Sequence, residues 1–364
     1  MNEFMSVSEM ESKAISLLDE PTKVFYVDGS DDQITLKENR KAYDRFYIIP
    51  RFLVGLKNID TSCSIFGKKY SMPIHCAPTS IQKMAHPDGE AGTAKACKDK
   101  NVIMCISTVF TSTLDEITEN NSSPGTRWMQ IYILKERSKT LKQIKMAERY
   151  NFEALVVTID SPVIGNRRAS KKLKITNKPF IKECVMNMLD ESEANKDEFI
   201  FNFFLQADSS ISWNDIKWLR SITNMKIIVK GVNSVEDALI AVNVGCDAVW
   251  ISNHGGRQLD SAVASIYLLP PIKRALINCE IPIFIDSGIV SGMNAFKALA
   301  MGADAVFVGR PVLWGLTIDG SKRVSKMLDL LHEELTRTMV LSGCSNIDSI
   351  RNVQVVHKNL LSKL

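Results

Sequence analysis

Eight short apolar runs that alternate with helical segments constrain the fold of this chain more than any other feature of its sequence. The apolar runs are Met72–Ala77, Val102–Ser107, Trp128–Ile133, Ala154–Asp160, Lys226–Lys230, Ala248–His254, Pro282–Asp286 and Ala305–Gly309. The helical segments between them are Asp88–Asp99, Lys139–Tyr150, Trp213–Ile222, Val235–Val244, Ala262–Ile277 and Met293–Ala300. This alternation predicts an α/β fold with a parallel sheet covered by helices. Because no G-x-G-x-x-G follows any run, we expect a closed (β/α)8 TIM barrel rather than a doubly wound sheet.

A short internal repeat supports the barrel. Residues 245–249 (Gly-Cys-Asp-Ala-Val) recur as residues 302–306 (Gly-Ala-Asp-Ala-Val), and each copy enters an apolar run. Repetition of this kind is expected when similar strand and helix units follow one another around a barrel.

The expected organisation is a single domain over residues 1–364. Residues 1–70 should form an N-terminal helical extension that covers the bottom of the barrel, plus a segment that reaches over its mouth. Residues 71–345 form the barrel, and residues 346–364 form a C-terminal tail. A long polar insertion after the fourth run, at about 164–210, is the expected lid.

Composition and charge disfavour several kinds of partner. The chain is 45% hydrophobic, yet no apolar stretch approaches the roughly 20 residues that span a bilayer, so we expect no membrane partner. Its net charge is only +4 and the basic run at residues 171–174 lacks interleaved aromatic residues, so we expect no nucleic-acid partner. Eight cysteines without a C-x-x-C pair suggest buried thiols in a reducing compartment, with neither a disulfide nor a metal site.

The residues Ser362, Lys363 and Leu364 match the peroxisomal address that an import receptor reads at a free carboxyl terminus. We therefore expect a peroxisomal protein with the import receptor as a partner. This location would suit a chemistry that produces peroxide.

The segment Ser252-Asn-His-Gly-Gly-Arg-Gln-Leu-Asp260 places His254 and Arg257 directly after an apolar run, separated by two glycines. At the carboxyl end of a strand, an imidazole can take a proton from a substrate while a guanidinium binds a carboxylate with two parallel hydrogen bonds. The pair predicts a small organic acid as substrate.

Polar residues also follow the other apolar runs, and the carboxyl ends of barrel strands form the active-site rim. The rim residues are Pro78, Thr79, Ser107, Gln130, Tyr132, Thr158, Asp160, Lys230, Ser252, His254, Asp286, Gly309 and Arg310. Asp160 can orient His254 and stabilise its imidazolium, which would raise the pKa of His254. Gly309 and Arg310 match the phosphate site typical of the last barrel loops. Lys230 could form a Schiff base or act as a fixed cation beside a flavin ring, and spacing alone leaves both open.

The chain resembles the FMN-dependent L-2-hydroxy-acid oxidase family, whose peroxisomal members include glycolate oxidase and long-chain hydroxy-acid oxidase. The resemblance runs from about residue 5 to the C-terminus. It rests on the nonapeptide from Ser252 to Asp260, and on Ala77-Pro78-Thr79, Gln130-Ile131-Tyr132, Thr158-Ile159-Asp160, Lys230-Gly231 and Gly309-Arg310-Pro311.

The resemblance implies an enzyme that oxidises an L-2-hydroxy acid to the 2-oxo acid with FMN, reduces O2 to H2O2 and forms a homotetramer. It implies that the flavin contacts Ala77, Pro78, Thr79, Ser107, Gln130, Thr158, Lys230, Ser252, Asp286, Ser287, Gly288, Gly309 and Arg310, the last two at its phosphate. His254 is then the catalytic base paired with Asp160. Arg257 and Arg167 hold the substrate carboxylate, and Tyr132 contacts the substrate hydroxyl. Lys230 stabilises the negative charge of the reduced flavin.

Three departures from the family pattern bear on specificity and cofactor retention. Phe25 stands where glycolate oxidases carry a tyrosine that binds the carboxylate, and Val109 stands where they carry a tryptophan. A longer or bulkier hydroxy acid is therefore expected in place of glycolate. Residues 286–290 read Asp-Ser-Gly-Ile-Val in place of Asp-Gly-Gly-Val-Arg, so an arginine near the FMN phosphate is missing and weaker FMN retention is expected.

Two alternatives to the oxidase remain open. One is an FMN-dependent 2-hydroxy-acid dehydrogenase that passes electrons to another acceptor, and the other is a flavin-binding barrel without catalytic activity. The terminal Ser-Lys-Leu favours the oxidase over the dehydrogenase. The joint presence of Tyr132, Asp160, Lys230, His254 and Arg257 argues against the inactive barrel.

Overall fold

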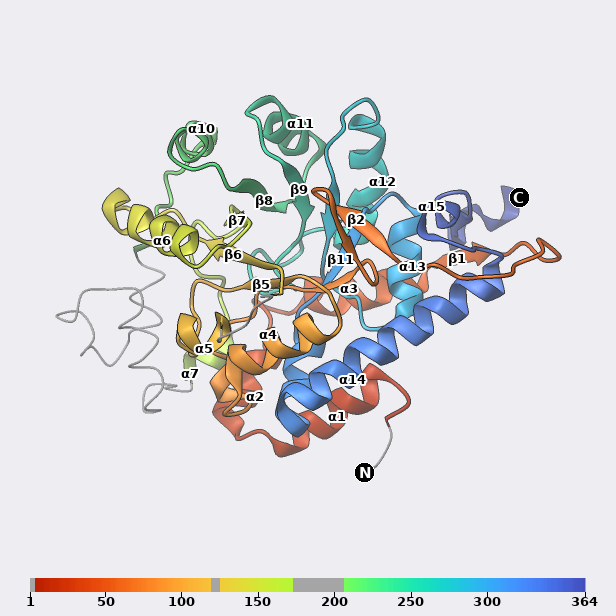
Figure 1. Ribbon diagram of the computed structural model, residues 1–364, viewed down its shortest axis with the longest axis horizontal. Helices are drawn as coiled ribbons and strands as arrows, with labels where there is room; N and C mark the ends of the chain where they lie inside the picture. Colours follow the sequence, from red (N-terminus) through yellow and green to blue (C-terminus); the bar gives the residue numbers. More distant parts are fainter. Residues whose placement is uncertain (1–3, 119–124, 173–205, 364) are drawn as a thin grey trace.

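A closed parallel barrel of eight strands forms the centre of the molecule (Figure 1). The computed structural model describes residues 4–118, 125–172 and 206–363. Around the barrel the strands follow one another in sequence order, and the last pairs with the first. The strands are β4 (Ile74–Cys76), β5 (Met104–Ile106), β6 (Arg127–Ile131), β7 (Ala154–Thr158), β8 (Lys226–Val232), β9 (Ala248–Ile251), β10 (Ile283–Ile285) and β11 (Ala305–Val308).

Each predicted apolar run overlaps one barrel strand, so the predicted TIM barrel is confirmed. All the barrel strands except β8 end earlier than the predicted runs, and β9 shows the reason. It stops at Ile251 because His254, with a φ of 59°, and the two glycines that follow turn the chain away from extended geometry. The polar residues after β9 therefore fall in a loop, whereas Gln130, Thr158 and Lys230 lie at the carboxyl ends of β6, β7 and β8.

Helices surround the barrel, and each of the six predicted helical segments forms one (Figure 1). Ser234 and Ser291 cap two of them by accepting hydrogen bonds from backbone N–H groups of the first turn. The helices after the barrel strands are α4 (Gly89–Asp99), α5 (Leu114–Thr118), α6 (Arg137–Arg149), α7 (Arg168–Lys172), α10 (Trp213–Ile222), α11 (Val235–Asn243), α12 (Ser265–Ala275), α13 (Gly292–Ala300) and α14 (Arg310–Ser342). Residues 173–205 of the predicted lid lie outside the described residues.

The bottom of the barrel is closed by a hairpin, whereas the sequence analysis expected helices there. Strands β2 (Cys63–Ile65) and β3 (Lys68–Tyr70) pair antiparallel and insert Ile65 into the barrel interior. At the hairpin turn, the ring of Phe66 lies 5.8 Å from that of Trp128 and 6.2 Å from that of Phe284. The aromatic side chains inside the barrel would otherwise be exposed to water at this end. Ile65 and Phe66 of the hairpin cover them.

The N-terminal helices lie instead at the mouth. They are α1 (Val7–Leu17), α2 (Glu20–Val27) and α3 (Ile34–Asp44), and α1 packs along α14. The side chains of Asn39 on α3 and Asn253 after β9 exchange two hydrogen bonds, which fixes α3 over the carboxyl ends of the strands. The extension thus becomes a wall of the site.

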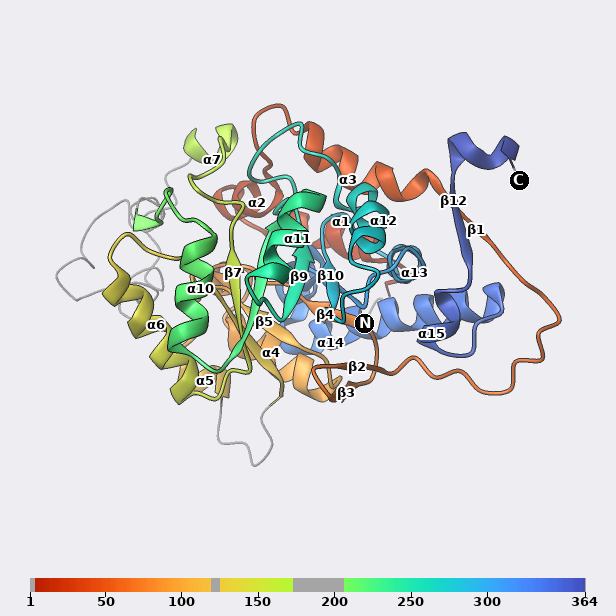
Figure 2. The same cartoon turned by 90° about the horizontal axis from the view of Figure 1, so that it is seen from above.

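A two-stranded sheet joins the N-terminal extension to the C-terminal tail. Strand β1 (Phe46–Ile49) pairs antiparallel with β12 (Gln354–His357), side by side in Figure 2. The other elements are η1 (Gln82–Met84), α15 (Ile347–Ile350) and η3 (Lys358–Lys363). None of the helices in the described ranges is both long and apolar enough to cross a membrane.

Candidate active site

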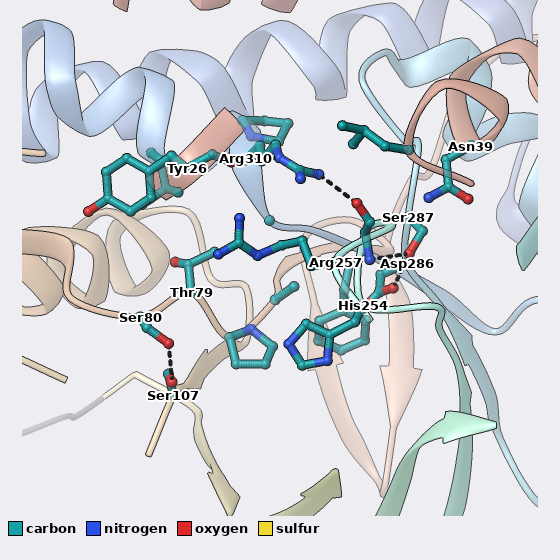
Figure 3. A pocket seen from close by; sticks show the side chains of 18 of the residues that line it. Tyr26, Asn39, Thr79, Ser80, Ser107, His254, Arg257, Asp286, Ser287 and Arg310 are labelled. Atoms are coloured by element: carbon teal, nitrogen blue, oxygen red, sulfur yellow. Dashed lines mark hydrogen bonds between the residues drawn. The ribbon is translucent and has the colours of Figure 1, made fainter. Parts of the chain in front are cut away.

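A cavity of about 370 Å³ opens at the barrel mouth, within the size range of small-molecule sites (Figure 3). Residues at and after the carboxyl ends of the barrel strands form its floor and sides, and residues of α1, α2 and α3 complete its wall. His254, Arg257 and Arg310 surround one space in Figure 3.

His254 is oriented by Asp160. The Nδ1 atom of His254 lies 3.0 Å from Oδ1 of Asp160, which follows β7. Gly231, with a φ of 103°, makes room for this carboxylate, because a Cβ there would lie 2.7 Å from the Cβ of Asp160. The pairing leaves Nε2 as the imidazole nitrogen that can exchange a proton with a substrate.

Asp160 acts to raise the pKa of His254, as the sequence analysis expected, but the net pKa is lower than usual. Burial lowers this pKa and outweighs the opposing effect of Asp160, and the charges of Lys230 and Arg167 lower it further. Burial raises the pKa of Asp160, but interactions with His254 and Lys230 outweigh burial and hold this pKa below the usual value. His254 is thus neutral, and Asp160 ionised, at neutral pH.

Lys230 is buried in an ion pair. Its Nζ atom donates to Oγ of Ser252 at 2.9 Å and lies 3.0 Å from Oδ2 of Asp286. Burial lowers the pKa of Lys230, but the charges of Asp286 and Asp160 outweigh burial and hold the pKa above its usual value. A protonated lysine is a poor nucleophile, so the geometry supports the fixed cation over the Schiff base.

Four arginines line the cavity, and three of them, Arg167, Arg257 and Arg310, come from segments after barrel strands. Burial lowers the pKa of these three, to about 10 for Arg310, and each still carries a proton at neutral pH. Arg257 donates through Nη1 to the carbonyls of Phe25 and Asp28, which binds α2 to the mouth. Partly buried positive charges that share one cavity favour an anionic ligand.

Phe25, Val109 and Tyr132 form a largely buried wall near the arginines. The guanidinium carbon of Arg257 lies 5.3 Å from the centre of the Phe25 ring, within cation–π range. Burial raises the pKa of Tyr132 well above its usual value, so its hydroxyl stays protonated.

Hydrogen bonds between the strand-end residues fix their side chains. Gln130 donates from Nε2 to Oγ1 of Thr158 at 3.0 Å, and the hydroxyls of Ser80 and Ser107 lie 2.9 Å apart (Figure 3). Thr79 accepts at Oγ1 from the side chain of Gln82 at 2.9 Å. The polar rim is therefore preorganised.

The loop after β10, which contains Asp286, Ser287 and Gly288, forms another part of the cavity lining. Ser287 donates from Oγ to Asp286 and accepts the backbone N–H of Gly255, at 2.8 and 3.1 Å. Gly288 packs against α3, since a Cβ there would lie 2.1 Å from the carbonyl oxygen of Asn39. This contact joins the loop to the N-terminal extension.

The structure brings together all the residues that the sequence analysis assigned to the site. All of them line the cavity except Asp160 and Ser252. Asp160 contacts His254, and Ser252 contacts Lys230, so both lie directly next to lining residues. Sequence reasoning missed several lining residues, including Glu11, Leu36, Asn39, Arg40 and Ser80. Four of these belong to α1 and α3, and no local motif indicates that these helices reach the mouth.

Comparison with known proteins agrees with this geometry. The model of the FMN-dependent dehydrogenase family matches residues 14–357. The 2-hydroxyacid oxidase of Dictyostelium discoideum is 39% identical over 367 residues, covering 100% of this chain and 93% of the relative. The peroxisomal (S)-2-hydroxyacid oxidase of Arabidopsis thaliana is 41% identical over 360 residues, covering 99% and 98%. A solved structure of mandelate oxidase matches with a TM-score of 0.89 and 32% identity, covering 98% of this chain and 99% of that one.

The chain therefore belongs to the FMN-dependent dehydrogenase family. Within it, the chain is an FMN-dependent oxidoreductase of the 2-hydroxy-acid oxidase group, which acts on the CH–OH of 2-hydroxy acids.

The residues at the mouth fit FMN on two observations. The buried Nη2 atom of Arg310 finds no hydrogen-bond partner among the described residues, although Nε and Nη1 bond to the carbonyls of Tyr26 and Gly255. Beside it, the backbone of Gly309 is open, since the nearest atom to a Cβ there would be Cγ2 of Thr79 at 3.6 Å. A phosphate can reach both groups.

Proposed function

We propose that this protein oxidises an L-2-hydroxy acid with a medium-length, long or bulky side chain to the 2-oxo acid, and reduces O2 to H2O2. The observation that carries the proposal is the pairing of His254 Nδ1 with Asp160 at 3.0 Å, beside a cavity that Arg167, Arg257 and Arg310 line. A base and a carboxylate clamp are what the oxidation of a 2-hydroxy acid requires.

Arg257 and Arg167 bind the substrate carboxylate and thereby place the CH–OH group beside His254. His254 takes a proton from the substrate, and the negative charge of Asp160 stabilises the imidazolium that forms. Tyr132, which stays protonated, donates a hydrogen bond to the substrate oxygen. Bound FMN supplies the acceptor for the two electrons that leave the substrate carbon.

FMN would lie across the strand ends. Its phosphate would be held by Gly309 and Arg310, and its ribityl chain by the loop of Asp286, Ser287 and Gly288. The ring would contact the backbone and side chains of Ala77, Pro78, Thr79, Ser107, Gln130, Thr158 and Ser252. Lys230 supplies a fixed positive charge beside the ring, which favours the reduced, anionic form.

The proposed preference for a larger acid rests on Phe25 and Val109, which line the cavity. Phe25 has no hydroxyl to donate to a carboxylate, so a small acid gains less binding energy. Val109 is a small side chain that leaves space for a substrate side chain. A similar solved structure is a tyrosine-to-phenylalanine mutant of mandelate oxidase with (S)-mandelic acid, a 2-hydroxy acid that carries an aryl group.

The test is a substrate panel on the FMN-loaded protein. Glycolate, L-lactate, L-2-hydroxybutyrate, longer L-2-hydroxy acids and (S)-mandelate are added without oxygen, and bleaching of the flavin absorbance gives the reduction rate for each. Air is then admitted and peroxide is assayed. Rapid bleaching followed by stoichiometric peroxide supports the oxidase. Bleaching with slow reoxidation in air favours a dehydrogenase, and no bleaching with any acid contradicts both.

We also propose a peroxisomal location, reached through an import receptor, and assembly as a homotetramer. Support for the location comes from the relative in Arabidopsis thaliana, whose name places it in peroxisomes. Import of a fluorescent fusion, compared with a version that lacks residues 362–364, tests the location. Sedimentation of the purified protein tests the assembly.

A further inference from the structure

The cavity lining carries charged side chains to which the site described above gives no role. Glu11 of α1 and Lys37 and Arg40 of α3 line the cavity, as do Val290 and Arg310. The charges of Arg40 and Glu11 act on Arg310, which places these two residues near it. A phosphate monoester carries a charge of about −1.5 to −2 at neutral pH. Arg310 contributes one positive charge and the N-terminus of α14 roughly half of another. This leaves part of the phosphate charge without a partner, and Val290 supplies none.

We propose that Arg40, held by Glu11, is a second guanidinium for the phosphate of FMN beside Arg310. The inference concerns cofactor retention and does not depend on which acid the enzyme oxidises.

The first argument is position. Arg40 follows Asn39, whose side chain bonds to Asn253 and whose carbonyl packs on Gly288. This segment of α3 is thereby fixed against both the loop after β9 and the loop after β10. Arg40 and Arg310 line the same cavity. The positive charge of Arg40 also adds to burial in lowering the pKa of Arg310, as expected for two nearby cations.

The second argument is the pairing of Arg40. Its Nη2 atom lies 2.7 Å from a carboxylate oxygen of Glu11, and its side chain is 44% exposed. An exposed pair of this kind stabilises a fold only weakly. Its stronger effect is to hold a long, flexible side chain in place beside the cavity, so that less conformational entropy is lost when a phosphate binds.

The third argument separates Arg40 from Lys37, the neighbouring cation on the same helix. Lys37 donates from Nζ to the carbonyl of Asp32 at 3.2 Å, an exposed contact one turn earlier in the chain. An ammonium is a compact charge, whereas a guanidinium can present two parallel N–H groups to phosphate oxygens. Arg40 is the better match for this ligand.

The test compares the FMN-loaded protein with Arg40→Met, Arg40→Lys, Glu11→Gln, Lys37→Met and Lys41→Met. Serial dilution, followed by the fluorescence of released flavin, gives the dissociation constant of FMN. In a second measurement each protein is equilibrated with equal excesses of FMN and riboflavin, which lacks the phosphate, and the ratio of the two bound flavins is determined. Lys41 is exposed on α3 and does not line the cavity, so its variant is the matched control for charge.

We expect Arg40→Met to raise the FMN dissociation constant at least tenfold and to shift the bound ratio toward riboflavin by a similar factor. Arg40→Lys should recover part of the ratio. Glu11→Gln should change FMN binding much less than Arg40→Met, because the loss of the contact that holds Arg40 is offset by removal of a negative charge near the phosphate. Lys41→Met should change neither measurement.

Two results would overturn the proposal. If Arg40→Met leaves the bound ratio unchanged, or if Glu11→Gln weakens FMN as much as Arg40→Met does, Arg40 only ties α3 to α1. If Lys37→Met shifts the ratio more than Arg40→Met, Lys37 holds the phosphate.

Discussion

His254 combines an unusual backbone conformation with a side chain that is only 23% exposed. Its φ of 59° is a left-handed conformation that costs a residue with a Cβ of the order of 1 kcal/mol. The hydroxyl of Ser252 accepts its backbone N–H at 3.1 Å and helps to hold this geometry. Burial keeps the imidazole neutral, so the residue is ready to accept a proton. The strained backbone of His254 thus occurs at the residue whose side chain must point toward Asp160 and the cavity.

Replacing His254 by glutamine tests the proposed base. The amide keeps the size and polarity of the side chain but cannot accept a proton at neutral pH, so turnover should fall by about 10²–10⁴. FMN absorbance and affinity should change little. Steady-state kinetics and flavin titration check the two parts, and turnover like that of the unaltered protein would show that another group is the base.

Asp160→Asn tests the partner of the base through pH dependence. The folded pKa of His254 is already below its usual value of about 6.5, and Asp160 opposes that shift. Removing the negative charge should lower the pKa further, so the acid limb of kcat/KM should move to lower pH. The plateau should also fall, because the imidazolium loses its stabilising charge. An acid limb that moves to higher pH would contradict the assigned pairing.

Arg257→Met tests the carboxylate clamp. Removal of the guanidinium should raise KM and lower kcat together, because it binds the carboxylate before reaction and steadies negative charge during it. Arg257→Lys should rescue only part of the loss, since an ammonium cannot form two parallel bonds. The variant also loses the bonds to α2, so FMN content is measured as a control. An unchanged KM would place the substrate carboxylate elsewhere.

At the scale of elements, the hairpin of β2 and β3 and the three N-terminal helices close opposite ends of the barrel. The hairpin covers the aromatic interior with Ile65 and Phe66, and the helices complete the cavity with residues such as Arg40. Stability and chemistry are thus separated along the barrel axis, as is usual for this fold.

Ile65→Ala tests this separation. Ile65 is 2% exposed within the barrel interior cluster, so its truncation should destabilise the protein by about 2–5 kcal/mol. The melting temperature of the FMN-loaded protein should fall, while KM and kcat below the melting range should stay unchanged. Ser64→Ala, on the exposed residue next to it in β2, is the matched control. A large change in KM would show that the bottom of the barrel is coupled to the mouth.

At the scale of the whole molecule, the sequence predicts those parts of the fold that depend on residues close together in the chain. Apolar runs bounded by turn residues locate every barrel strand, and the chain direction then places His254, Lys230 and Asp160 on one rim. Long-range packing decides the rest. The position of α3 over the mouth depends on contacts such as Asn39 with Asn253, and the lowered pKa of His254 depends on burial by the assembled cavity. Neither has a local motif.

Substrate preference also belongs to this scale, because the cavity wall joins Phe25 of the N-terminal extension to Val109 of the barrel. Without a tyrosine hydroxyl at residue 25, small acids lose binding energy, whereas a longer side chain recovers roughly 0.8 kcal/mol for each methylene that it buries. We expect kcat/KM to rise from glycolate through 2-hydroxybutyrate to medium-chain or aryl-substituted acids.

The double variant Phe25→Tyr with Val109→Trp should reverse this preference, because it restores a hydrogen bond for the carboxylate and fills the space for the side chain. The two single variants show how much of the change in substrate preference comes from residue 25 and how much from residue 109. The measurement is kcat/KM across the same acids, with FMN content as the control for correct folding. If the unaltered protein oxidises glycolate best, the cavity does not use the space beside Val109 for the substrate, and the proposed preference is wrong.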